Sequence, residues 1–70
     1  MSMEEVDVKF KDIKTGAAVP ELPSPYPAGD LQLGKKIRIH LFKGGWRAYK
    51  IKRIVDGDPT EVYVKRLWLF

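Results

Sequence analysis

The chain has no cysteine, a single histidine and no long uncharged stretch among its 70 residues. Without cysteine it has no disulfide bond, no thiolate metal site and no cysteine nucleophile. The longest uncharged stretch, residues 22–29, contains three prolines. It is therefore too short and too rich in proline to span a bilayer or to form the core of a signal peptide. We expect an intracellular, cytoplasmic protein with no membrane partner.

Helical patterning is also absent, because no segment repeats its apolar residues every 3.6 positions. Only four residues are alanine, whereas eleven are valine or isoleucine, and β-branched side chains favour strands. The length allows one domain, so we treat residues 1–70 as a single small all-β domain. Because a domain of this size buries only about 60% of its unfolded surface, binding on an outer face is more economical than a deep cleft.

Alternating apolar and polar residues, the pattern of a half-buried strand, predict most of the secondary structure. Strands are expected over residues 5–13, 31–41, 46–55 and 61–70, with a short returning strand over 17–19. Gly34 and Lys35 interrupt the second of these and indicate a bulge or a bend. Gly44-Gly45 and the segment 56–59, Asp-Gly-Asp-Pro, predict tight turns between the later strands.

Residues 20–30 form a proline-rich loop, with four prolines between positions 20 and 27. Proline lacks an amide donor and has a fixed φ angle, so this segment is neither a central strand nor the interior of a helix. We expect an ordered loop with Leu22 and Tyr26 packed against the domain. Pro20 and Pro23 also have the P-x-x-P spacing that aromatic-lined grooves bind, but a flanking basic residue is missing.

Four to five short antiparallel strands in 70 residues predict a small β-barrel. The SH3-like barrel is the expected form, because the tight turns after residues 43 and 55 leave no room for a helix. The OB-like barrel is the alternative.

Charge is divided unevenly along the chain. Residues 1–30 hold three lysines against six acidic residues, whereas residues 31–70 hold ten Lys and Arg against three acidic residues. A concentrated positive charge attracts an anionic partner more effectively than the net charge of +4 alone.

Basic residues mixed with aromatic ones on one sheet face suit nucleic acid, since cations neutralise phosphates and flat rings stack on bases. We predict a non-enzymatic nucleic-acid-binding module. Its predicted contact residues are Lys36, Arg38, Phe42, Trp46, Lys50 and Lys52, with Lys65 and Arg66 at the periphery.

Two alternatives stay open. Lys and Arg are ordinary choices for a solvated sheet face, where they also oppose edge-to-edge aggregation. The chain can also be a protein-interaction or assembly subunit, of a larger complex or a viral particle, and it can form a homo-oligomer. It would then use the proline-rich loop and the apolar end of the last strand, residues 67–70.

No combination of residues predicts an enzyme, a metal site or a cofactor. His40 has no partner at metal-ligand spacing, and Asp56 and Asp58 are best explained as turn residues. The alternation does not fix the side of the sheet on which four residues lie, because inward arginines in the strand over 46–55 would require a bulge and residues 67–70 are apolar on both sides. These are Arg47, Arg53, Trp68 and Phe70.

Overall fold

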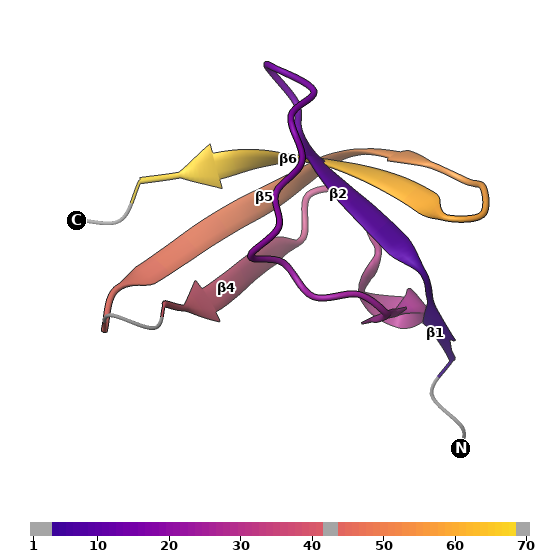
Figure 1. Ribbon diagram of the computed structural model, residues 1–70, viewed down its shortest axis with the longest axis horizontal. Helices are drawn as coiled ribbons and strands as arrows, with labels where there is room; N and C mark the ends of the chain where they lie inside the picture. The colour runs from indigo at the N-terminus through magenta and orange to yellow at the C-terminus, as the bar shows by residue number, and fades with distance from the viewer. Residues whose placement is uncertain (1–3, 42–43, 69–70) are drawn as a thin grey trace.

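The computed structural model describes residues 4–41 and 44–68, which form a four-stranded and a two-stranded β-sheet without an α-helix (Figure 1). The strands are β1 (Glu5–Val6), β2 (Val8–Asp12), β3 (Tyr26–Pro27), β4 (Lys36–His40), β5 (Trp46–Val55) and β6 (Thr60–Leu67), and Ala28–Asp30 form one 3-10 turn. The all-β prediction is confirmed. Within the described ranges, no helix is long and apolar enough to cross a membrane.

The large sheet has the strand order β2-β6-β5-β4, and β1 pairs with β3 in the small one. In the large sheet, the β4–β5 and β5–β6 pairs are antiparallel hairpins, as predicted, but β2 lies parallel to β6. The prediction of antiparallel strands throughout is wrong at this pair. Because β2 joins a strand from the other end of the chain, no tight turn fixes its direction.

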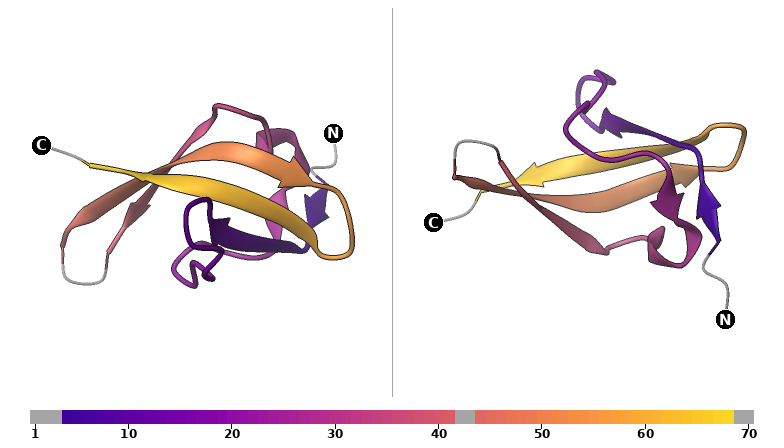
Figure 2. Two further views of the ribbon diagram at one scale, coloured as in Figure 1. Left: turned by 90° about the horizontal axis from the view of Figure 1, so that it is seen from above. Right: turned by 60° about the horizontal axis from the view of Figure 1, so that its bottom comes forward.

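The described strands do not close into a barrel. The large sheet ends at β2 and β4, which do not pair with each other, and Figure 2 shows a twisted sheet with an open side. The predicted returning strand at 17–19 is reduced to a single bridge between Lys11 and Ala18. The structure supports the all-β class, while neither predicted barrel type is formed by these strands.

The two faces of the large sheet differ in character. We call the face that carries the core the inner face and the opposite one the outer face. The buried core consists of Val8, Phe10, Leu22, Ile37, Tyr49, Ile51, Val62 and Val64. All but Leu22 come from the four strands, and the alternation of side chains along each strand leaves their neighbours on the outer face.

The proline-rich loop covers the inner face, as predicted (Figure 1). Leu22 is buried in the core, and the ring of Tyr26 packs edge-on against Phe10 with centroids 5.5 Å apart. Glu21 of the same loop accepts a hydrogen bond from the Tyr49 hydroxyl and one of 3.0 Å from Arg47 Nη1. The loop is therefore held by both apolar and charged contacts.

These bonds change the pKa of each partner. The hydrogen bond from Tyr49, with a smaller contribution from Arg47, lowers the pKa of Glu21. Burial, followed by the bond to Glu21, raises the pKa of Tyr49. The arrangement thus stabilises a charged Glu21 beside a neutral Tyr49.

A β-bulge in β5 explains why its sequence pattern is irregular. Ile51 lies opposite Val64, but Arg53 already lies opposite Tyr63, so Lys52 is the extra residue. The bulge reverses the alternation: Arg53 lies on the outer face, whereas Arg47, before the bulge, lies on the inner side and reaches Glu21.

The strand predicted over residues 31–41 is shorter in the structure. Gly34 has a φ angle of 83°, and Lys35 N–H donates to the Gln32 carbonyl, so the chain turns before β4 begins. Ile37 and Ile39 point inward as predicted, whereas Leu33, predicted to share their side, is 68% exposed. The interruption at Gly34 is thus a turn.

Candidate nucleic-acid interface

A row of three lysines crosses the outer face. Lys36 of β4 lies directly opposite Lys50 of β5, which in turn lies directly opposite Lys65 of β6. Side chains opposite each other in a sheet are close neighbours, and like charges there are destabilising. None of the three forms an ion pair with a carboxylate of the described residues. These three residues, which we call the lysine row, are therefore a concentration of uncompensated positive charge.

The next row along the same strands combines a cation with a small and an apolar residue. Arg38 lies opposite Ala48, and Ala48 lies opposite Leu67. Ala48 is only 3% exposed although it faces outward, because longer side chains surround it. The short side chain of Ala48 therefore leaves a depression in the outer face between Arg38 and Leu67.

Aromatic rings complete the surface at the end of β4. His40 lies opposite Trp46, and their ring centroids are 4.7 Å apart. The guanidinium carbon of Arg38 lies 5.5 Å from the centre of the Trp46 ring. Trp46 is nonetheless 55% exposed, so its ring remains accessible beside the cations.

The outer face continues across β6 to β2. Tyr63 has Lys11 Nζ at 5.9 Å and the Arg53 guanidinium at 5.6 Å from its ring centre. Lys11 also forms a 2.8 Å ion pair with Glu61. This bond raises the pKa of Lys11 and lowers the pKa of Glu61. The side chains at this end of the face are thus held by charged contacts.

Acidic residues are almost missing from this surface. Of the carboxylates in the described strands, Glu61 alone occupies an outer-face position, and it is paired with Lys11. The outer-face cations are Lys9, Lys11, Lys36, Arg38, Lys50, Lys65 and Arg53, with Lys52 in the bulge. Such a distribution gives the face a positive potential.

Most of the predicted contact residues gather on this face. Lys36, Arg38, Trp46, Lys50 and Lys65 occupy outer positions of three adjacent strands. Lys52 lies beside them as the extra residue of the bulge. Phe42 and Phe70 lie outside the described residues.

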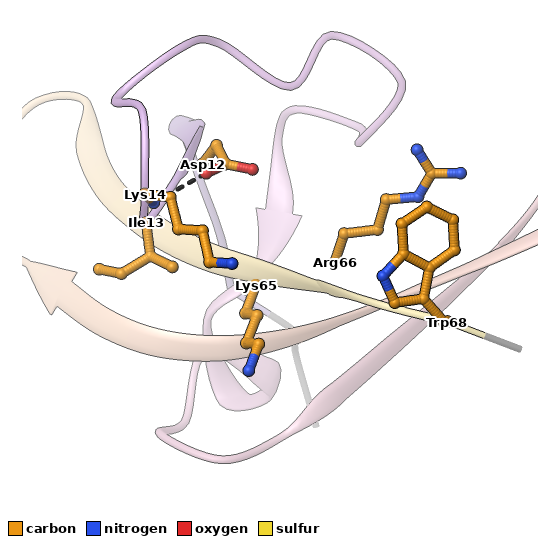
Figure 3. A pocket seen from close by; sticks show the side chains of 6 residues that line it. All are labelled: Asp12, Ile13, Lys14, Lys65, Arg66 and Trp68. Atoms are coloured by element: carbon orange, nitrogen blue, oxygen red, sulfur yellow. Dashed lines mark hydrogen bonds between the residues drawn. The ribbon is translucent and has the colours of Figure 1, made fainter.

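Arg66 is the exception among the predicted residues. It lies opposite Tyr49, on the inner side of β6. Figure 3 shows Lys65 and Arg66 leaving the strand in opposite directions. The guanidinium of Arg66 packs against Trp68 at 4.8 Å from the ring centre, and Trp68 is 73% exposed. Alternation along β6 separates Arg66 from the lysine row.

Sequence reasoning missed the contribution of β2. Lys9 and Lys11 alternate with the core residues Val8 and Phe10, so their outward direction is visible in the sequence. Their place beside β6 is not visible, because it depends on a parallel pairing between distant segments. Arg53 was missed for a different reason, since only the bulge brings it to the outer face.

Two shallow recesses lie near the end of β6, and Trp68 lines both of them. On the outer face, a recess of about 440 Å³ is lined by Lys36, Arg38, Ala48, Leu67 and Trp68. A second of about 420 Å³ is lined by Asp12, Ile13, Lys14, Lys65, Arg66 and Trp68 (Figure 3). Both combine cations with an apolar surface, but only the first opens between the rows described above.

The described residues contain no group of three or more His, Asp or Glu side chains that could hold a metal ion. Comparison with known proteins adds no family, since no family model matches the chain and no curated protein or solved structure is significantly similar to it.

Proposed function

We propose that this protein is a small non-enzymatic binding module that binds nucleic acid through the outer face of its large sheet. The observation that carries the proposal is the row of Lys36, Lys50 and Lys65 in directly opposite positions. Like charges placed this way destabilise a sheet. A polyanion that neutralises all three would remove that cost.

The expected mechanism combines charge neutralisation with stacking. Phosphates bound by lysines release condensed counterions, and this release drives much of the affinity. Trp46, exposed beside Arg38, offers a flat surface on which a base can stack. Stacking of this kind contributes about 1–3 kcal/mol per base.

A charge reversal at the centre of the row tests the proposal. Lys50→Glu places a carboxylate between Lys36 and Lys65, where it lowers the charge of the row from +3 to +1 and repels phosphate. We expect the affinity for a fluorescently labelled oligonucleotide at low salt to fall at least tenfold.

Lys14→Glu is the matched control, because it changes the net charge by the same amount at an exposed turn residue that belongs to neither row of the outer face, although it lines the second recess with Lys65. The control should bind nearly as the unmodified protein does. Equal losses in the two variants would mean that net charge alone governs binding and would contradict a site on the outer face.

Exposed apolar side chains favour a second candidate function, that of a protein-interaction or assembly subunit. Trp68 and Leu33 are 73% and 68% exposed, and apolar side chains on the surface are typical of contacts with other chains. The proline-rich loop contributes little to this candidate, because its Leu22 is buried. Sedimentation over a range of protein concentrations distinguishes the two: self-association reduced by Trp68→Ser would favour assembly.

A further inference from the structure

The recess above Ala48 narrows the class of nucleic acid, and this inference rests on the proposed function. We propose that the protein binds single strands, with one unpaired base seated in the recess between Arg38 and Leu67 and the adjoining phosphates on the lysine row.

The recess has the size and lining for a flat, partly apolar ring. It is shallow, with a volume of about 440 Å³, so a ring seated in it would keep one side exposed to solvent. Ala48 is its floor, because the shortest side chain of the row lies between two longer ones. Leu67 supplies an apolar wall and Arg38 a planar cation, and both types of surface pack against bases.

The lysine row lies beside this recess, where it can bind the phosphates next to a seated base. Lys50 is two residues from Ala48 along β5, which places the two outer-face rows about 7 Å apart. Lys36 belongs to the row and also lines the recess. A base above Ala48 therefore has cations within reach of the phosphate attached to its own sugar.

A duplex does not satisfy this geometry. Paired bases are stacked within the helix, so neither of their faces can reach a recess on a protein surface unless the base leaves the stack. The lysine row alone would bind the phosphates of either form. The recess is thus the element that distinguishes single strands from duplexes.

Ala48→Leu tests the inference by filling the floor of the recess. The larger side chain extends outward and not into the core, since Ala48 lies opposite Arg38 on the outer face. Binding of a single-stranded and a duplex oligonucleotide would be measured at one low salt concentration. We expect about a tenfold loss of affinity for the single strand and little change for the duplex.

Ala17→Leu is the matched control, because it makes the same substitution at an exposed position outside the strands. Leu67→Ala, which removes the wall without filling the recess, should weaken single-strand binding as well and guards against misfolding of Ala48→Leu. Unchanged single-strand binding in both recess variants, or equal losses for single strand and duplex, would overturn the inference. If the unmodified protein binds neither oligonucleotide, the proposed function itself fails.

Discussion

Lys50 lies directly opposite Lys36 on the neighbouring strand, with Lys65 on its other side. Three adjacent like charges without a described carboxylate partner oppose folding. Their joint position is explained if the row serves to bind an anion, because the same repulsion becomes attraction when phosphates are present. Stability and binding should therefore respond in opposite directions to changes in this row.

Reversing the charge of Lys50 tests whether stability and nucleic-acid binding change in opposite directions. In Lys50→Glu, the new carboxylate attracts both neighbouring lysines, so the free energy of unfolding should rise by about 0.5 kcal/mol while oligonucleotide binding falls. Urea denaturation without nucleic acid measures the first effect. Lys14→Glu should leave the urea midpoint within experimental error. A clear loss of stability in Lys50→Glu would show that the row is not electrostatically strained.

The turn before β4 depends on the backbone of Gly34. Its φ angle of 83° is in a region that other residues rarely adopt, although no atom lies within 4 Å of an added Cβ. Gly34→Ala should therefore destabilise the protein by about 1 kcal/mol through backbone strain alone. Gly29→Ala, also without a nearby atom but with an ordinary φ angle, should be neutral or slightly stabilising. Thermal unfolding of the two variants measures the difference.

Acid should weaken the anchoring of the proline-rich loop. The hydrogen bond from Tyr49 and the pairing with Arg47 hold the pKa of Glu21 below its ordinary value of 4.5. The stability from these contacts is therefore complete above that ordinary value and is lost as the pH falls through the lower pKa of the folded state. We expect the unfolding free energy of the unmodified protein to decline in this acid range.

Removal of the Glu21 charge should make the decline of the unfolding free energy at acidic pH smaller. Glu21→Gln should lose about 1 kcal/mol at neutral pH, a value reduced by the partial exposure of the group. Glu61, whose pKa is also lowered, accounts for part of the decline that remains. Denaturation curves across the acid range provide the test. An identical decline in Glu21→Gln and the unmodified protein would contradict the assignment to Glu21.

The residue pattern predicted individual strands and turns well, but it did not predict which distant strands pair. The bounds of β5 follow from the predicted turns on either side of it, Gly44-Gly45 and Asp-Gly-Asp-Pro, because both turns are local signals. The parallel partner of β2 depends on the packing of Phe10 and Val8 against the core, which no local signal encodes. The open edge of β4 and the failure of the described strands to close into a barrel follow from the same long-range arrangement.

The candidate site was predictable where alternation was regular. Lys36, Arg38 and Lys50 could be assigned to one face because a hairpin joins their strands. The prediction grouped Arg66 with Lys65, but consecutive strand residues face opposite sides, so the two side chains do not share a face. The recess above Ala48 could not be foreseen, since it requires the register of three strands at once.

The salt dependence of single-strand binding tests the central claim most directly. For single strands, the slope of log affinity against log salt concentration is about −0.7 for each phosphate neutralised. If Lys36, Lys50 and Lys65 each bind one phosphate, the slope should be about −2 or steeper, and Lys50→Glu should make it shallower while Lys14→Glu should not. Quenching of the fluorescence of Trp46 and Trp68 would follow the titration without a label. A slope near zero, or one that is the same in Lys50→Glu, would contradict nucleic-acid binding by the outer face.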